Sequence, residues 1–326
     1  MKRLSVVLII IGFAAWFAVS AAGRDVVRIA LDWTPNTNHT GIVVAQALGF
    51  FEEEDLEVEI VQPGPTASIQ LTASGQTDFG VSMQEYVTMA RAEGIPVVSI
   101  AAVFPHNTSG FASPLEAGIL SPADFEGKRY GGWGSDLESV MIRTVMDVYE
   151  ADASTVEMIT LGMLDFTTAV RRDFADFYWI FYGWQGIHAS LEGVAFNYLP
   201  LTELSDALDY YTPVIIASER MISQSPEVVR RFVHAIARGY TYAVAEPAAA
   251  ADALLAFAPE LDPELVHSSQ AWLVTQAIGD IEQWGRQRLE TWSAFGAWAY
   301  ENGLIEQAII PEAAFTNVFL PAESSE

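Results

Sequence analysis

Polar and aromatic side chains gather in one short segment near the start of the chain, residues 32–41, Asp-Trp-Thr-Pro-Asn-Thr-Asn-His-Thr-Gly. Trp33 offers an aromatic face, and Asn38 and His39 offer groups that can hydrogen-bond to the edge of a small flat molecule. This combination is typical of a small-molecule recognition site. The alternative is that Pro35 forms a tight turn and that Trp33 belongs to the core.

The segment lies between a predicted strand and a predicted helix. Apolar residues alternate at Val27, Ile29 and Leu31, as in a β-strand, and residues 41–51 carry apolar side chains at helical spacing. In a parallel α/β sheet, ligands collect at the carboxyl ends of strands, where the N-termini of the following helices also lie. The segment is therefore a strand-to-helix loop at the position where such proteins bind ligands.

Three further predicted strands, residues 78–82, 128–132 and 176–182, also end in polar and aromatic sequence. If two lobes face each other across a cleft, rings from both sides would stack on a flat ligand, while amides and a carboxylate would bind its edge. The four strand ends supply the candidate ligand-binding residues Trp33, Asn38, His39, Gln84, Trp133, Glu138, Tyr182 and Trp184.

Several alternatives stay open at these strand ends. Glu138 follows Ser135 in a Ser-x-x-Glu capping box, so capping of a helix explains it as well as ligand binding does. Residues 131–134, Gly-Gly-Trp-Gly, match neither a dinucleotide fingerprint nor a P-loop. The sequence contains no G-x-S-x-G or H-E-x-x-H motif and no histidines at metal-ligand spacing, which weakens an enzymatic interpretation without excluding it.

The composition limits the possible partners. The formal net charge is −26, and so acidic a surface repels phosphate backbones, which argues against nucleic acid as a partner. The chain contains no cysteine, which excludes disulfides, thiolate nucleophiles and thiolate metal sites.

The N-terminus has the pattern of a secretory leader. Met1-Lys2-Arg3 is followed by an apolar run over residues 4–19 and by small residues at 20–23. We expect a signal peptide over residues 1–22 and a mature protein outside the cytoplasm, in the periplasm or on the outer face of the membrane. The alternative is an uncleaved anchor, because the run approaches the ~20 apolar residues that a spanning helix needs.

Two successive sets of strands and helices indicate an α/β protein with two lobes. The first set covers residues 23–110, and the second restarts near Pro114 and continues to Pro213. An apolar strand at 214–217 and long helical segments then follow. We predict one lobe from residues 23–110 and 214–326, a second lobe from residues 111–213, and a ligand cleft between them.

Four segments together resemble a known family: residues 32–41, 79–85, 130–135 and 179–184. They resemble the ABC-transporter periplasmic binding proteins that include the thiamine-pyrimidine binders of the ThiY type and the fungal thiamine-pyrimidine synthase. The resemblance covers nearly all of the chain after the leader. It implies a two-lobed periplasmic-binding-protein fold of type II, with a hinge, that closes on a pyrimidine and delivers it to a membrane permease.

The synthase branch of this family uses pyridoxal phosphate bound by a lysine, a nearby histidine and a cysteine-rich iron motif. The resemblance places Ser82 at the position of that lysine and Tyr86 at the position of that histidine, and cysteine is absent. His39 matches a histidine that the family shares, but it supplies neither part of the synthase chemistry. These departures favour a binding protein over an enzyme.

We therefore expect a monomeric solute-binding protein of an ABC importer. Its ligand would be a thiamine-precursor pyrimidine, such as formylaminopyrimidine or hydroxymethylpyrimidine, and it would hold no metal or other cofactor. Two alternatives are a synthase-like enzyme with pyridoxal phosphate and the same binding fold for riboflavin or another small aromatic ligand. An alkanesulfonate-like anion is disfavoured because none of the four strand ends supplies an Arg or a Lys.

Overall fold

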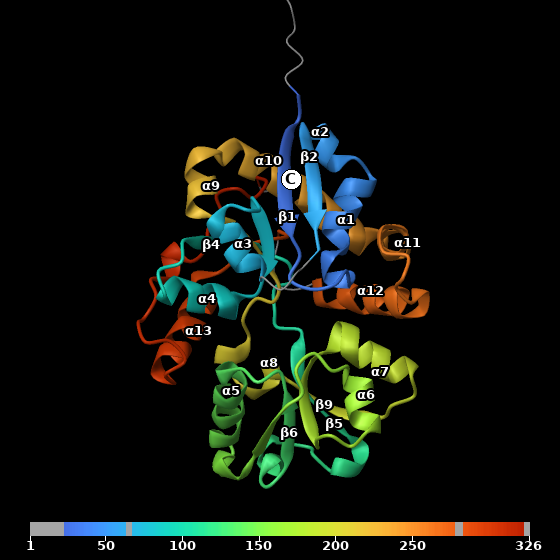
Figure 1. The fold of residues 1–326 in the computed structure, drawn as a ribbon, viewed down its shortest axis with the longest axis vertical. Coiled ribbons are helices and arrows are strands. Elements are labelled where there is room, and N and C mark those ends of the chain that lie inside the picture. Colours follow the sequence, from blue (N-terminus) through green and yellow to red (C-terminus); the bar gives the residue numbers. More distant parts are fainter. Residues whose placement is uncertain (1–22, 63–66, 278–282, 323–326) are drawn as a thin grey trace, which may run out of the picture.

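The computed structural model describes residues 23–62, 67–277 and 283–322, so the predicted signal peptide, residues 1–22, lies outside the described residues. Two five-stranded sheets form two lobes, one above the other in Figure 1. Within the described ranges, no helix is both long and apolar enough to cross a membrane.

The first sheet has the strand order β2-β1-β3-β10-β4. Its strands are β1 (Asp25–Ala30), β2 (Leu56–Val61), β3 (Phe79–Ser82), β4 (Val97–Ala102) and β10 (Val214–Ser218). β1 pairs in parallel with β2 and β3, whereas β10 is antiparallel to β3 and β4. The strand-helix order of residues 23–110 predicts a parallel sheet, and β1, β2, β3 and β4 do run in one direction. β10 returns from the second lobe and is inserted between β3 and β4 in the opposite direction.

The second sheet has the strand order β7-β6-β8-β5-β9. Its strands are β5 (Ser109–Pro114), β6 (Arg129–Gly132), β7 (Glu157–Thr160), β8 (Phe177–Phe181) and β9 (Phe196–Pro200). β6 is parallel to β7 and β8, and β5 is antiparallel to β8 and β9. The sequence does not predict β5 or β9. Glycine, serine and proline weaken the strand pattern of β5, and both strands are defined by pairing with strands distant in the sequence.

Helices cover both sheets. The first lobe carries α1 (Thr40–Ala47), α2 (Phe50–Glu53), α3 (Ser68–Ser74), α4 (Gln84–Ala92), α9 (Glu219–Gln224), α10 (Pro226–Ala245), α11 (Pro247–Phe257) and α12 (Pro263–Ala277). The second lobe carries α5 (Asp136–Asp147), α6 (Phe166–Arg171), α7 (Ile187–Leu191) and α8 (Leu201–Leu204). Proline at the first position of α10, α11 and α12 suits the fixed φ of a helix start.

α10 packs on the first sheet through its apolar face. The Phe232 ring stacks on Phe79 of β3 at a centroid distance of 3.8 Å, and both side chains are buried. Such aromatic pairs contribute about 0.5–1.5 kcal/mol beyond the area they bury. This packing fixes β3, and with it the residues that follow the strand, against the rest of the lobe.

The chain crosses between the lobes twice, and one carboxylate ties the two crossings together. Asp209 accepts a hydrogen bond from the Asn107 backbone N–H at 3.0 Å and lies 2.7 Å from His106 Nδ1. The Asn107 side-chain amide donates to the Leu208 carbonyl at 2.9 Å. The two connecting segments therefore have a fixed register at the point where a hinge would bend. The division into residues 23–110 with 214–326 and residues 111–213 stays a prediction.

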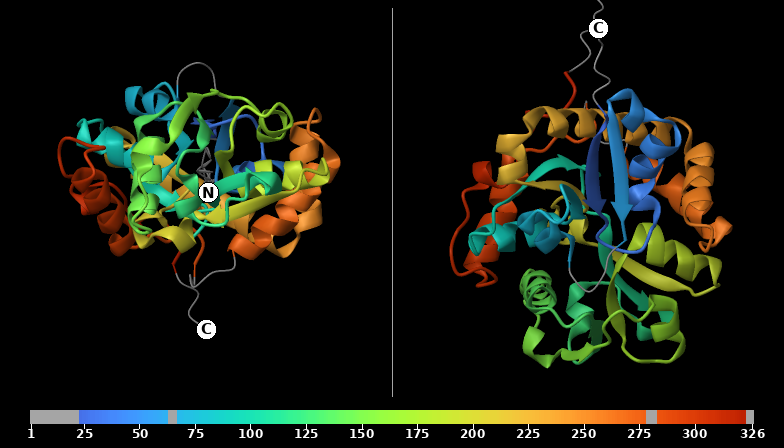
Figure 2. Two further views of the ribbon diagram at one scale, coloured as in Figure 1. Left: turned by 90° about the horizontal axis from the view of Figure 1, so that it is seen from below. Right: turned by 45° about the horizontal axis from the view of Figure 1, so that its top comes forward.

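Helix α13 (Leu289–Glu301) contributes to the cores of both lobes. Trp292 packs with residues of the first lobe, whereas Phe295 and Trp298 pack in the core of the second lobe. Trp298 Nε1 donates to Thr144 Oγ1 of α5 at 3.0 Å. In Figure 2, the red segment with α13 and the orange segment with α11 and α12 lie on opposite sides of the molecule. The sequence predicts a helix over residues 283–302, and in the structure α13 begins later, at Leu289.

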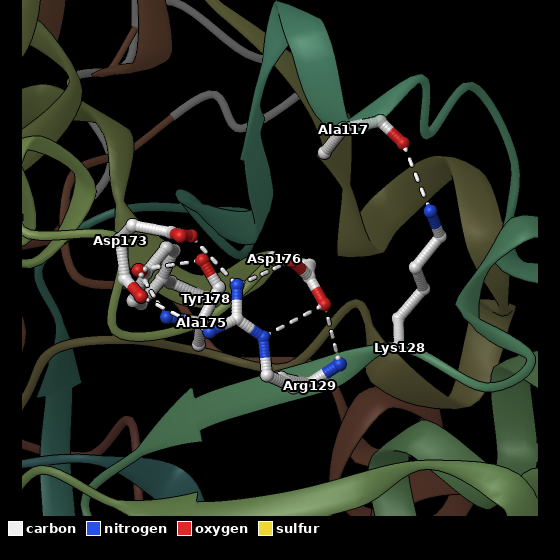
Figure 3. A network of polar contacts seen from close by, with 7 residues as sticks. All are labelled: Ala117, Lys128, Arg129, Asp173, Ala175, Asp176 and Tyr178. Atoms are coloured by element: carbon white, nitrogen blue, oxygen red, sulfur yellow. Dashed lines mark hydrogen bonds and ion pairs between the residues drawn. The ribbon is translucent and has the colours of Figure 1, made fainter.

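An ion-pair network lies at the start of β6 and β8. Arg129 contacts Asp173 at 2.6 Å and Asp176 at 2.8 Å, as Figure 3 shows. The hydrogen bonds from Arg129 hold the pKa of Asp176 below its usual range. Arg129 is the first residue of β6 and Trp133 follows its last residue, so this cation lies at the opposite end of the strand from the predicted ligand site.

Candidate functional site

Loops from both sheets meet around Tyr86, the third residue of α4. Burial, together with the nearby carboxylates of Glu85, Glu138 and Asp32, raises the pKa of Tyr86 to about 12. Asp32 follows β1, Glu85 follows β3 and Glu138 follows β6. Because charges act over short distances inside a protein, the ends of these three strands lie close to one another.

Glu85 is the most unusual side chain in this region. The residue is 1% exposed, and one of its carboxyl oxygens has no hydrogen-bond partner. Burial, with a smaller contribution from the Asp32 carboxylate, raises the pKa of Glu85 to about 8. The carboxyl group is therefore protonated at neutral pH, so it can both donate and accept a hydrogen bond. A buried polar atom without a partner is uncommon and marks a place where a ligand or water belongs.

Tyr210, beside the second crossing, adds another polar group. Its hydroxyl is buried without a hydrogen-bond partner, and burial and the Glu85 carboxyl raise its pKa well above the usual range.

The aromatic candidates Trp33 and Trp133 differ in their surroundings. Trp33 is 41% exposed, whereas Trp133 is half-buried and lies 4.8 Å from the Trp179 ring.

His39 is wholly buried, and both of its ring nitrogens have partners. Nε2 lies 2.7 Å from the Asp32 carboxylate, and Nδ1 accepts a hydrogen bond from the Asn36 backbone N–H at 3.3 Å. These are the contacts of a residue that positions Asp32 and caps the short η1 helix (Thr37–His39). Asn38, the preceding residue, is half-buried, and its backbone carbonyl accepts a hydrogen bond from the Tyr240 hydroxyl at 2.8 Å.

Gln84 is also wholly buried and joins three parts of the fold. Its Oε1 accepts a hydrogen bond from the Tyr211 backbone N–H at 2.9 Å, and its Nε2 donates to the Thr291 carbonyl at 3.3 Å. Gln84 thus ties α4 to the second crossing and to α13. The side-chain amide of Gln84 is therefore hydrogen-bonded within the fold, whereas one carboxyl oxygen of the next residue, Glu85, has no hydrogen-bond partner.

Glu138 accepts hydrogen bonds at both carboxyl oxygens. Oε1 accepts from the Tyr130 hydroxyl at 2.7 Å and from the Trp133 N–H at 2.8 Å. Oε2 accepts from the N–H groups of Gly134 and Ser135, each at 2.8 Å. The capping box with Ser135 is confirmed. Glu138 therefore shapes the loop that carries Trp133.

Tyr182 and Trp184 belong to a single π-helical turn, η5 (Tyr182–Gly186), which follows β8. The Tyr182 ring lies 5.1 Å from Trp272 of α12, and 4.8 Å from Tyr198. Trp184 packs on a cluster that includes Val43 of α1, Leu254 of α11 and Val266 of α12. Both rings of the second lobe thus contact the first lobe.

Asp32, Glu85 and Tyr210 are polar residues at the meeting point of the strand ends that are absent from the candidates selected from the sequence. Asp32 directly precedes Trp33, and Glu85 directly follows Gln84, so the strand-end pattern could have found both. Tyr210 lies just before a crossing and has no such signal. Its position depends on how the second crossing packs against α4, which only the tertiary structure shows.

Neither a metal nor the synthase cofactor has matching side chains here. In the described part of the chain, no three His, Cys, Asp or Glu side chains group closely enough to hold a metal ion. Ser82 ends β3 and is buried, and its hydroxyl cannot form an imine with pyridoxal phosphate as a lysine amine would.

Comparison with known proteins agrees with this architecture. A formylaminopyrimidine-binding protein of Halalkalibacterium halodurans is 29% identical over 312 residues, covering 90% of each chain. A 4-amino-5-hydroxymethyl-2-methylpyrimidine phosphate synthase of Legionella pneumophila is 27% identical over 299 residues, covering 90% of this chain and 92% of the synthase. The periplasmic aliphatic sulphonate-binding protein SsuA of Escherichia coli is 14% identical, with a TM-score of 0.71 over 93% of this chain and 96% of its own.

The last comparison shows the fold, a two-lobed α/β architecture shared with periplasmic binding proteins. A family model described as NMT1/THI5 like matches residues 36–250, which include the second part of the first loop (residues 36–41), the buried Glu85, the capping box at Glu138 and the η5 turn. The chain therefore belongs to the NMT1/THI5-like family.

Proposed function

We propose that this protein is the extracytoplasmic solute-binding component of an ABC importer and that it captures a thiamine-precursor pyrimidine of the formylaminopyrimidine or hydroxymethylpyrimidine type. The observation that supports the proposal is the buried Glu85 carboxyl, with one unpartnered oxygen, near Tyr86 and Tyr210 at the meeting point of the strand ends. The relative from Halalkalibacterium halodurans, named as a formylaminopyrimidine-binding protein, supports the same ligand class.

The chemistry of Glu85 matches an aminopyrimidine. A 4-aminopyrimidine presents a ring nitrogen that accepts a hydrogen bond beside an amino group that donates one. A protonated carboxyl group presents the complementary pair, an O–H donor and a C=O acceptor. With a pKa of about 8, Glu85 keeps its proton at neutral pH, and its unpartnered oxygen can bind the ring nitrogen or the amino group of the ligand. Trp33 and Trp133 would supply the stacking faces.

The electrostatics of the site disfavour an anionic ligand. Besides burial, the charges of Asp32 and Glu138 raise the pKa of Tyr86, and the charge of Asp32 raises the pKa of Glu85. Bringing a sulfonate or phosphate into this region would add a further negative charge at a place of low dielectric constant. The sulfonate-binding proteins thus support the fold of this chain, and the ligand is inferred from Glu85 and its neighbours.

The protein acts as a carrier and does not make the pyrimidine. The synthase relatives show that family membership alone leaves both activities open. Ser82 and Tyr86 stand where the resemblance places the lysine and the histidine of the synthase branch, and neither can replace the group it stands for. Delivery to a permease would follow closure of the lobes, with the protein acting as a monomer in the periplasm or on the outer face of the membrane.

A substitution at Trp33 separates ligand binding from stability. Trp33→Ala is expected to weaken the binding of an aminopyrimidine about fivefold, because one stacking ring contributes roughly 1 kcal/mol. The free energy of unfolding should change by less than about 0.5 kcal/mol, since the ring is 41% exposed. Titration calorimetry and urea unfolding measure the two quantities.

The matched control is Tyr149→Ala, which removes another exposed aromatic ring, 45% exposed and just beyond α5. It should change neither quantity. A large loss of stability in Trp33→Ala, with unchanged affinity, would place Trp33 in the core and remove it from the ligand site.

A further inference from the structure

One hydroxyl group joins the loops of the two lobes. Ser269 of α12 is wholly buried, its Oγ lies 2.5 Å from Thr37 Oγ1, and it donates a hydrogen bond to the Gly183 carbonyl. Thr37 belongs to the loop after β1 in the first lobe, and Gly183 belongs to the η5 turn after β8 in the second lobe. A single side chain of α12 therefore fixes the distance between the recognition loop and the opposite strand end.

Apolar contacts surround this hydrogen-bonded junction. Trp184 of η5 packs on Val43, Leu254 and Val266, all of which belong to the first lobe. α12 lies along the lower edge of the first lobe and contacts η5 and α7 of the second lobe (Figure 1). Burial of a tryptophan ring contributes favourably on closure and is lost on opening. The contact is thus a further connection between the lobes, separate from the two crossings and from α13.

The backbone of Gly183 approaches α12 so closely that no side chain would fit. A Cβ atom at this position would lie 2.7 Å from the Trp272 ring, nearer than non-bonded carbon atoms approach. The turn that brings Gly183 there is π-helical, a rare geometry that is frequently found at functional sites. Both features indicate that η5 is shaped to fit the surface of the first lobe.

We propose that the η5 turn is the closing contact between the lobes, that Trp184 anchors it and that Ser269 is the residue that positions it. This assignment replaces a stacking role for Trp184, whose ring is committed to the first lobe. In the closed protein Ser269 holds the loop after β1 and the turn after β8 in one register, so the ligand groups on both sides face each other. The effect on ligand release depends on the proposed function, whereas the effect on lobe opening does not.

The test measures the separation of the lobes in the ligand-free protein from residue 23 onwards. The chain has no cysteine, so Leu48→Cys and Met163→Cys give one label on each lobe at exposed positions. Distances between spin labels report the open and closed populations. Ser269→Ala is expected to raise the ratio of open to closed protein about tenfold, the effect of one buried hydrogen bond. Gly183→Ala should raise the ratio of open to closed protein further, because the added Cβ would collide with the Trp272 ring when the lobes are closed.

Ser68→Ala is the matched control. Ser68 is buried, and its hydroxyl donates to the Val81 carbonyl within the first lobe, so its loss should lower stability without lengthening the label distance. Far-UV circular dichroism confirms that each variant is folded. Unchanged distance distributions in both Ser269→Ala and Gly183→Ala would overturn the proposal.

Measuring the binding and dissociation of a pyrimidine distinguishes this proposal from the proposed function. If a pyrimidine binds, its dissociation rate from Ser269→Ala should rise about tenfold. If no pyrimidine binds to any variant while the label distances change as expected, the closing contact stands and the proposed function fails. If the pyrimidine binds and its dissociation rate is the same in all variants, η5 has no role in retaining the ligand and this part of the proposal is wrong.

Discussion

The free energy of unfolding is expected to fall by at most about 5 kcal/mol as the pH rises from 4.5 to 8. The cause is Glu85, whose pKa rises from 4.5 to about 8 on folding, because its carboxyl group is buried and lies near Asp32. Between these two pH values the unfolded chain has lost this proton and the folded protein still holds it. The folded state therefore binds more protons, and its stability falls as the pH rises. Above pH 8 the loss is complete.

Urea unfolding at a series of pH values measures this dependence. Glu85→Gln keeps the size of the side chain and removes the titration, so its stability should change much less over this range. The control is Glu93→Gln, an exposed residue just beyond the end of the same helix, which should follow the unmodified protein. Asp124, Asp152 and Asp176 have pKa values below their usual range, so their effects lie at acidic pH and do not overlap. Parallel curves for Glu85→Gln and the unmodified protein would contradict a buried, protonated Glu85.

Replacing Glu138 by alanine is expected to lower the free energy of unfolding by about 3 kcal/mol. The carboxylate accepts hydrogen bonds from the backbone N–H groups of Trp133, Gly134 and Ser135 and from the Tyr130 hydroxyl. Alanine would leave the buried Tyr130 hydroxyl and the half-buried Trp133 N–H without a partner, whereas the N–H groups of the exposed Gly134 and Ser135 could bind water. Glu138→Gln should lose less, because one carbonyl oxygen still accepts two of the bonds. Urea unfolding of both variants measures the difference.

A second capping box in the same lobe provides the control. Asp124 accepts hydrogen bonds from the N–H groups of Leu120 and Ser121, each at 2.9 Å, and its side chain is only partly buried. Asp124→Ala should cost about 1 kcal/mol, the usual effect of losing a cap. If Glu138→Ala were no more destabilising than Asp124→Ala and yet abolished ligand binding, Glu138 would be a ligand-binding residue rather than the support of the Trp133 loop.

The sequence predicts the strands that carry the site better than it predicts the use of each side chain. Alternating apolar residues before Asp32 and the buried run before Gln84 locate two strand ends correctly. β5 and β9 are missed because their pairing is with strands distant in the sequence. Antiparallel insertion of β10 is missed for the same reason, since a strand's direction depends on where the chain returns.

The roles of individual side chains depend on partners that no local pattern shows. His39 and Glu138 each follow a tryptophan within six residues, a pattern typical of a ligand site. In the structure, each of them has hydrogen-bond partners in its own loop. Gln84 and Glu85 are neighbours of similar size, and only the tertiary structure shows that the first has partners and the second does not. The Ser-x-x-Glu pattern at Ser135 is predictable because it is local.

Titration calorimetry at pH 7 with formylaminopyrimidine, comparing the protein from residue 23 onwards with its Glu85→Leu variant, tests the role of Glu85 in ligand binding. We expect one site with a Kd of about 1 µM or below, at least a hundredfold weaker binding in Glu85→Leu, which lacks both the donor and the acceptor, and no binding of pyridoxal phosphate. Equal affinity in both proteins would remove Glu85 from the site. Binding of pyridoxal phosphate or riboflavin without any binding of the pyrimidine would contradict the proposed function itself.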